Sequence, residues 1–254
     1  MRVGFIGVGA ITAAIVTGLK GSALADWPIV LSPRNVDVAR GLAASLPGVT
    51  VAASNQSVVD GSDVLVLAVR PQVAAEVLSG LRARPDQPVI SLIAATAAAD
   101  IARWTGARQV CRAIPLPFVA ERSDVTPVFP PLPVAMELFG ALGTALPVRD
   151  QASFDLYGAL SALMETYFGL LGGLSDWSVR HGLPEGEARA YLAGLFLNLS
   201  RVAATSPLSF EALRAAHSTE GGLNEQVHRD FVRHGGPEAL ARALDRVLQR
   251  ITAA

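Results

Sequence analysis

The segment that most constrains the fold is a glycine turn placed between a strand and a helix. The apolar run Val3–Ile6 leads directly into Gly7-Val8-Gly9, and helical periodicity follows over 12–19. Gly7 permits a tight turn, and Gly9 removes a side chain where the backbone would approach a phosphate group. The following helix would present its N-terminal amides to that group. The unit therefore predicts a site for the pyrophosphate of a dinucleotide, with a ligand-free tight turn as the alternative.

Two regions of the chain differ in their sequence pattern. Through about residue 145, short apolar runs alternate with helical segments, a pattern typical of parallel strands covered on both faces. After Pro147 only helical periodicity is visible. We therefore predict an α/β fold. Residues 1–147 form an N-terminal Rossmann-type doubly wound sheet domain, and 148–254 form an all-α C-terminal domain.

The predicted elements follow the hydrophobic periodicity. Strands are expected over 3–6, 28–31, 49–52, 63–69, 89–93 and 109–113. Helices are expected over 12–19, 36–45, 55–59, 73–81 and 97–104, and then over 154–175, 184–204, 209–216, 223–234 and 237–251. Local signals support three boundaries. Ser209 precedes a helix start, Pro184 suits a first helical turn, and Gly235-Gly236 separates the last two helices.

Charge and composition exclude several classes of partner. The chain has 21 basic and 22 acidic residues, so nothing indicates a nucleic-acid surface. Hydrophobic residues make up 51% of the sequence, which indicates apolar surface to bury, for example between subunits. The nearly apolar stretch 156–174 carries Glu165 in its middle, which favours an interface helix over a membrane span. Glycines interrupt the apolar start of the chain, so we expect no secretion signal.

The single cysteine, Cys111, lies in the apolar run Gln109-Val110-Cys111-Arg112-Ala113-Ile114. No histidine is near it in sequence to activate it, so we interpret it as a small buried hydrophobe rather than a catalytic thiol. One cysteine excludes an internal disulfide and suits the reducing cytoplasm, where we expect the protein. The four histidines lack the spacing of metal ligands, and no metal site is predicted.

The end of the second predicted strand indicates which dinucleotide is bound. An NAD site favours an Asp or Glu there for the ribose 2′-hydroxyl. This chain instead has Ser32, Arg34 and Asn35, which supply hydrogen-bond donors and one positive charge. Those groups suit a 2′-phosphate, so NADP(H) is favoured over NAD(H). The alternative is that Arg34 is a solvated loop residue.

Small residues follow two further predicted strands. In open parallel sheets, ligands bind across the carboxyl ends of the strands, and small side chains there leave room for the ribose and nicotinamide. We add the start of the first helix and these strand ends to the predicted cofactor site: Ala10, Ile11, Ala68, Val69, Arg70, Pro71, Ala94 and Ala95.

Several motifs resemble, in order and spacing, the pyrroline-5-carboxylate reductase family. They are Gly4-Phe5-Ile6-Gly7-Val8-Gly9, Ala68-Val69-Arg70-Pro71-Gln72, the Ser91 strand, Arg112-Ala113-Ile114-Pro115, Gly182-Leu183-Pro184 and the segment 217–224. The resemblance implies NADPH-dependent reduction of a cyclic imine acid to proline. It also implies a helical dimerisation domain, and a homodimer whose active site forms where the subunits meet.

The chain departs from the family pattern around the substrate. The family's Ser-Pro-Gly-Gly-Thr-Thr loop is here Thr219-Glu220-Gly221-Gly222-Leu223-Asn224, and its glycine-rich dimer-helix start is Ser161-Ala162-Leu163-Met164-Glu165-Thr166-Tyr167. The resemblance implies substrate contacts at Thr219, Gly221, Gly222, Leu223 and Asn224, where backbone amides could hold a carboxylate.

Glu165, Tyr167 and Asn224 are the candidate catalytic residues, as proton donors or substrate partners. Each has an alternative interpretation. Glu165 could form an ion pair at a subunit interface, Tyr167 could be a core residue, and Asn224 could cap the last helix but one.

Three functional hypotheses remain open from the sequence. The first is an NADPH-dependent reductase of pyrroline-5-carboxylate or a close cyclic imine. The second is a reductase of another small substrate, such as a β-hydroxy acid or a biosynthetic keto or imine intermediate. Enzymes of the β-hydroxy acid class would use a lysine on the long interdomain helix, whereas the single lysine here is Lys20. The third is a non-catalytic NADP-binding protein.

Overall fold

A computed structural model describes residues 1–253 and separates them into two compact units. The first unit comprises Met1–Ser161 together with the end of the chain from Leu248 onward. The second comprises Ala162–Val247. Each unit is described below by itself.

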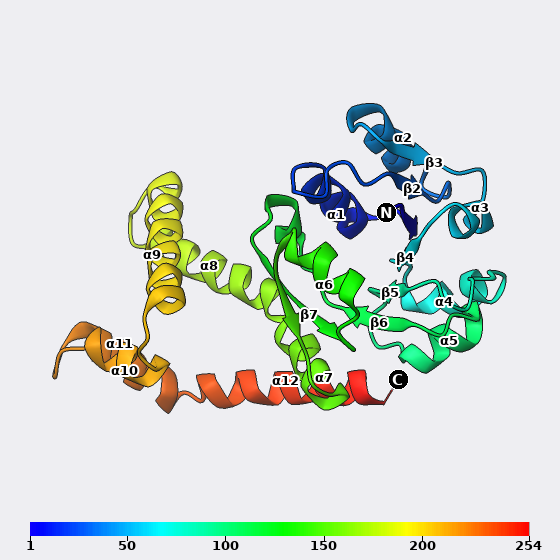
Figure 1. Cartoon of the computed structure of the whole chain (residues 1–254). Helices are drawn as coiled ribbons and strands as arrows, with labels where there is room; N and C mark the ends of the chain where they lie inside the picture. Colours follow the sequence, from blue (N-terminus) through cyan, green and yellow to red (C-terminus); the bar gives the residue numbers. More distant parts are fainter. Residues whose placement is uncertain (254) are drawn as a thin grey trace. The chain divides into compact units, whose positions relative to one another are not determined.

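The first unit is built on one eight-stranded sheet with the order β3-β2-β1-β4-β5-β6-β7-β8 (Figure 1). All neighbouring strands are parallel except β6 and β7. The strand order reverses direction between β1 and β4, which is where ligands bind in doubly wound sheets. The strands are β1 Val3–Ile6, β2 Ile29–Leu31, β3 Val49–Val51, β4 Val64–Leu67, β5 Val89–Ser91, β6 Val110–Ala113, β7 Asp124–Phe129 and β8 Gly143–Pro147.

Helices bury both faces of this sheet, which explains the continuous apolar runs in the sequence. One core cluster joins α1, α2 and α6 to one face, and a second joins α3, α4 and α5 to the other. The predicted doubly wound sheet is therefore confirmed. The helices are α1 Ala10–Lys20, α2 Val36–Ser45, α3 Asn55–Asp60, α4 Pro71–Ser79, α5 Ala98–Thr105, the 3₁₀ turn η1 Pro117–Glu121, α6 Pro133–Gly140 and α7 Gln151–Leu160.

The region between 114 and 147 contains elements that the hydrophobic pattern did not predict. η1, β7, α6 and β8 all lie there. Prolines at positions 127, 130, 131 and 133 obscure the periodicity, because they read as turn signals. A buried carboxylate compensates for this irregular chain path. Asp124 accepts hydrogen bonds from the Leu116 amide at 3.0 Å and from the Thr126 hydroxyl at 2.6 Å.

The predicted helix over 154–175 is two helices in the structure. α7 ends at Leu160, and α8 Leu163–Arg180 begins after a break at Ser161 and Ala162. Both the backbone amide and the hydroxyl of Ser161 donate to the Tyr157 carbonyl, at 2.9 and 2.8 Å. Ser161 is thus the C-cap of α7, and apolar periodicity alone does not reveal the break that follows it.

α7 belongs to the sheet unit. Phe154 is buried against β7, with its ring 6.2 Å from that of Phe129. The Arg112 guanidinium lies 4.7 Å above the Phe154 ring and 3.9 Å from the Asp155 carboxylate. Burial lowers the pKa of Arg112, and Asp155 opposes that shift. Compactness thus divides the chain after Ser161, whereas the predicted boundary at 147/148 marks the end of the last strand.

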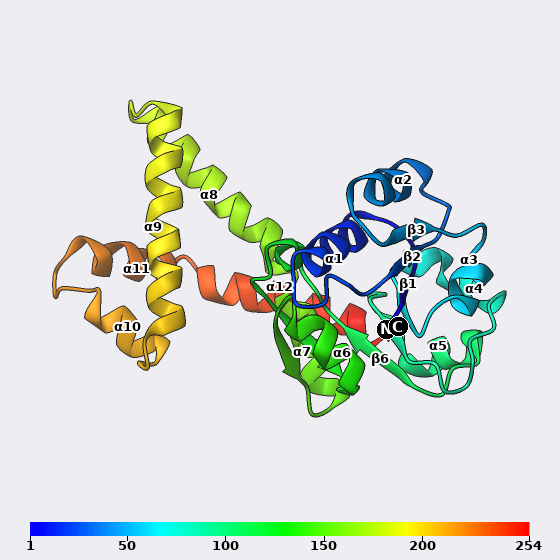
Figure 2. The same cartoon turned by 45° about the horizontal axis from the view of Figure 1, so that its top comes forward.

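The second unit is entirely helical. It contains α8, α9 Glu185–Thr205, α10 Phe210–Ala216, α11 Leu223–Arg233 and most of α12 Gly236–Thr252 (Figure 2). The Ser209 hydroxyl caps α10 by accepting from the Ala212 amide at 3.2 Å, as predicted. Pro184 precedes α9 by one residue rather than lying inside its first turn. Within residues 1–253, no helix is long and apolar enough to cross a membrane.

Candidate functional site

The two glycines of the first turn have different structural roles. Gly7 has φ +96°, and a Cβ built there would lie 2.6 Å from the Ala68 carbonyl oxygen. No other residue fits this close approach of β1 to β4. Gly9 is the N-cap of α1, and a Cβ there would meet nothing within 4 Å. Gly9 therefore leaves a space above the N-terminus of α1, which is where the pyrophosphate of a dinucleotide fits.

Three side chains hold this turn by hydrogen bonds to its backbone. The Gly7 amide donates to the Ser32 hydroxyl at 3.0 Å, and the Thr12 hydroxyl donates to the Gly7 carbonyl at 2.7 Å. The Asn35 amide group donates to the Val8 carbonyl at 2.8 Å. Thr12 departs from the usual Gly or Ala of the motif, and its bond to Gly7 accounts for that departure. The sequence motif gives no signal for this role.

Arg34 differs from its neighbours Ser32 and Asn35. It lies between β2 and α2 and is exposed. Among residues 1–253 no carboxylate comes within 4.0 Å of its guanidinium. Its charge is thus available to a ligand at the carboxyl end of β2, whereas the polar groups of Ser32 and Asn35 already bond to the glycine turn.

The remaining predicted cofactor residues lie at the same edge of the sheet. The backbone of Ala68 and Val69 packs against Gly7, and Arg70 is the exposed N-cap of α4, which begins at Pro71. After β5, Ala94 is exposed and Ala95 adopts φ +49°, a left-handed conformation uncommon for alanine. The Thr96 hydroxyl donates to the Ala94 carbonyl at 3.2 Å and supports that turn. The structure therefore brings the predicted cofactor residues together.

The predicted substrate residues lie in the helical unit. Glu165 is exposed in the first turn of α8, and Tyr167 follows it one half-turn later. The Tyr167 ring packs edge-on against Phe168 and Phe196, with centroids 5.3 and 6.1 Å apart. This packing fixes the ring, while the side chain stays partly open to solvent.

The loop before α11 is ordered by its own hydrogen bonds. The Gly221 amide donates to the Glu225 carboxylate at 2.5 Å, and the Gly222 amide donates to the Thr219 carbonyl at 2.8 Å. Asn224 does not cap α11, since Gly222 is the N-cap and the Asn224 side chain donates to the His217 carbonyl at 2.7 Å. The amides left for a carboxylate are therefore those of the first turn, beginning at Leu223.

The two groups of predicted substrate residues are not adjacent within the second unit. Both views show the α10–α11 connection well away from the first turn of α8 (Figures 1 and 2). A single helical unit therefore does not bring Asn224 to Glu165 and Tyr167.

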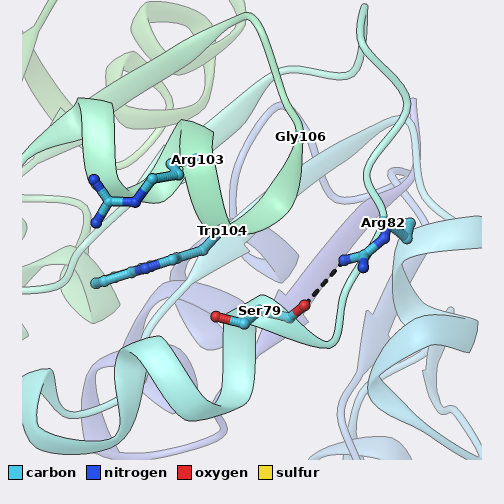
Figure 3. Close-up of a pocket in the computed structure, with 5 residues that line it drawn as sticks. All are labelled: Ser79, Arg82, Arg103, Trp104 and Gly106. Carbon is cyan, nitrogen blue, oxygen red and sulfur yellow. Dashed lines mark hydrogen bonds between the residues drawn. The ribbon is translucent and has the colours of Figure 1, made fainter.

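A cavity of about 280 Å³ lies elsewhere in the sheet unit (Figure 3). It is lined by Ser79, Arg82, Arg103, Trp104 and Gly106. Arg82 donates to the Ser79 and Leu81 carbonyls at 2.9 and 2.7 Å, and Arg103 pairs with Asp100 at 2.6 Å. The cavity faces the C-terminal ends of α4 and α5, whose dipoles disfavour anions. It is a poor site for a nucleotide phosphate.

Cys111 is fully buried on β6, which confirms its interpretation as a small hydrophobe. Burial raises the pKa of its thiol to about 12. At neutral pH the group is protonated and has no path to a substrate, so it is not a nucleophile.

Taken together, the sheet, the switch point and the glycine turn define the class of dinucleotide-binding oxidoreductases with an added helical domain. Two family models match the chain. The first, NADP oxidoreductase coenzyme F420-dependent, covers residues 2–95. The second, pyrroline-5-carboxylate reductase dimerisation, covers residues 151–253.

Relatives and solved structures agree with these matches. The pyrroline-5-carboxylate reductase of Pseudomonas aeruginosa is 26% identical over 98% of this chain and 95% of its own length. That of Methanosarcina acetivorans is also 26% identical, over 98% and 96%. The structure of the Streptococcus pyogenes enzyme has a TM-score of 0.87 at 21% identity, covering 100% of this chain and 99% of that one. This chain belongs to the pyrroline-5-carboxylate reductase family.

Proposed function

We propose that this protein is an NADPH-dependent reductase that converts pyrroline-5-carboxylate, or a close cyclic imine, to proline or the corresponding amine in the cytoplasm. The observation that carries the proposal is the glycine turn with an open space at Gly9 and an exposed cation at Arg34. The curated relatives, which are named for this reduction and match along nearly the whole chain, support it.

Each part of the cofactor site has a task. The N-terminus of α1 binds the pyrophosphate across Gly9, Ala10 and Ile11. Arg34 binds the 2′-phosphate by a charge-assisted hydrogen bond. The strand ends at Ala68 to Pro71 and at Ala94 and Ala95 leave room for the ribose and the nicotinamide ring. When bound there, NADPH would supply a hydride to the carbon of the C=N bond, and a proton on the nitrogen would complete the reduction.

The helical unit supplies the substrate side. The first-turn amides of α11 suit the substrate carboxylate, and Asn224 lies in that turn. Glu165 and Tyr167 can orient the ring nitrogen or deliver a proton to it. Because one helical unit does not bring these two groups together, we assign the complete site to a homodimer in which both subunits contribute. Positioning of the two reactants then supplies most of the rate.

Lys20 argues against a dehydrogenase of the β-hydroxy acid type. Its ammonium group donates to the Ala25 and Trp27 carbonyls, both at 2.8 Å, and so anchors the loop after α1. It is the single lysine of the chain, and it is committed to this loop rather than to proton transfer.

The test is turnover of NADPH with L-Δ1-pyrroline-5-carboxylate, followed by the loss of nicotinamide absorbance and by detection of proline. We expect stoichiometric oxidation of NADPH and formation of proline. A panel of cyclic imines without the carboxylate and a small β-keto acid serve as comparison substrates. Binding of NADPH without turnover of any imine would overturn the proposal.

A further inference from the structure

We propose that NADPH is distinguished from NADH by Arg34 alone among the polar residues that follow β2, whereas Ser32 and Asn35, with Thr12, are positioning residues that shape the glycine turn. The inference rests on the proposed cofactor. It divides a cluster whose members look equivalent in the sequence, since all three of Ser32, Arg34 and Asn35 carry donors suited to a phosphate.

Burial separates Ser32 and Thr12 from any ligand. Their exposed fractions are 1% and 0%. Both hydroxyls meet the same residue, since Ser32 accepts from the Gly7 amide and Thr12 donates to the Gly7 carbonyl. Gly7 has a left-handed backbone conformation with φ +96°, and it follows the last residue of β1. The two hydroxyls therefore bond both polar backbone groups of Gly7 and hold the turn.

Asn35 completes the support one residue further along. Its side-chain amide donates to the Val8 carbonyl at 2.8 Å, across 27 residues of sequence. Asn35 also precedes α2, but its side chain makes no capping bond to that helix. The bond to Val8 therefore ties the start of α2 to the glycine turn.

Arg34 has no comparable structural bond. It is exposed, and no carboxylate lies within 4.0 Å among the described residues. A 2′-phosphate carries two negative charges near neutral pH, whereas a 2′-hydroxyl carries none. A group that contacts only that substituent changes the affinity for NADPH and not for NADH. A group that shapes the glycine turn changes both affinities by the same factor, because both dinucleotides carry the pyrophosphate that this turn is proposed to bind.

The experiment measures the dissociation constants of NADPH and NADH by nicotinamide fluorescence for the wild type, Arg34→Ala, Ser32→Ala and Thr12→Val. We expect Arg34→Ala to weaken NADPH by about 10- to 100-fold, the range of a lost charge-assisted hydrogen bond, and NADH by less than about two-fold. Ser32→Ala and Thr12→Val should weaken both by a common factor of about five, leaving their ratio unchanged. Thermal melts of each variant verify that binding is measured on folded protein.

The ratio of the NADPH and NADH affinities shows which residue contacts the 2′-phosphate. A Ser32→Ala variant that loses NADPH but keeps NADH would show that the hydroxyl contacts the phosphate, and would overturn the inference. So would an Arg34→Ala variant with equal losses. Since binding is measured without substrate, failure to reduce an imine would overturn the proposed function and leave this assignment standing.

Discussion

The two units of this protein differ in how far their apolar side chains are buried. In the sheet unit, large residues such as Phe5 and Leu67 are fully buried, and two clusters fill both faces of the sheet. In the helical unit only Ser178 and Ala188 are buried, while Tyr191, Phe210 and Leu223 are 72%, 78% and 82% exposed.

This difference shows which unit is complete within one chain. The sheet unit has a core of its own, so its geometry is set by contacts inside a single subunit. The exposed apolar residues of the helical unit are far more extensive than a stable monomer leaves uncovered. The match of this segment to a dimerisation domain agrees with that conclusion. The residues of the predicted cofactor site therefore lie within one chain, and we propose that the substrate half depends on a second copy.

The largest expected effect comes from charging the exposed apolar surface. The double variant Phe168→Asp and Tyr191→Asp places two carboxylates at exposed aromatic positions of α8 and α9. Burying a charge between subunits is unfavourable. We therefore expect the dissociation constant of the dimer to rise by at least about 100-fold and turnover to fall in parallel. Sedimentation at several concentrations and steady-state kinetics measure the two effects.

The matched control is Val125→Asp, an equally polar change at an exposed apolar residue of the sheet unit. It should leave the oligomer intact. NADPH affinity should change by less than about two-fold in all of these variants, because the predicted cofactor site lies within the sheet unit of one chain. A monomeric double variant with full activity would show that the site does not need the second copy.

The second prediction separates the stability of the glycine turn from its affinity for the dinucleotide. Gly7→Ala forces an alanine into φ +96° and against Ala68, so the free energy of unfolding should fall by about 2 kcal/mol or more. Gly9→Ala meets no atom within 4 Å and should leave stability unchanged, yet weaken NADPH and NADH alike by about tenfold or more. Denaturant unfolding and dinucleotide titration distinguish them. Normal NADPH affinity in Gly9→Ala would remove the pyrophosphate from this position.

The third prediction concerns the substrate residues. Asn224→Ala and Glu165→Gln should raise KM for the imine or lower kcat by about tenfold, the effect of losing one hydrogen bond to a charged group. NADPH affinity should be unchanged, because both residues belong to the helical unit. Gln226→Ala, an exposed change two residues after Asn224, is the control. Loss of cofactor binding in either variant would contradict this division of the site.

The smallest effect concerns Cys111. Its burial and a pKa raised to about 12 predict no reaction of the native protein with Ellman's reagent at pH 8, and one thiol per chain after unfolding. A free thiol titrates near 9.0, so the unfolded chain loses this proton first as the pH rises. The contribution of Cys111 to stability is therefore present below pH 9 and is lost between pH 9 and about 12. Rapid labelling of the native protein would indicate that β6 is accessible.

Much of the fold was predictable because its signals are local. Apolar runs predicted β1 to β6, and glycines and a serine marked helix ends at positions 209 and 235. The segment with η1, β7, α6 and β8 was not predictable, since its prolines resemble loop signals and its strands depend on pairing with β6. The break after α7 was not predicted because the apolar pattern continues through Ser161, the residue at which the helix ends.

The sequence by itself determined the glycine turn, the class of cofactor and the division into a sheet region and a helical region. These depend on residues close together in the chain, where steric freedom and periodicity act directly. Only the tertiary structure decided the contacts of Thr12, Ser32, Arg34 and Asn35, because these contacts depend on what lies opposite each side chain. The hydroxyls of Ser32 and Thr12 bond to the backbone of Gly7, and the side-chain amide of Asn35 bonds to the carbonyl of Val8. The positive charge of Arg34 remains available to a ligand.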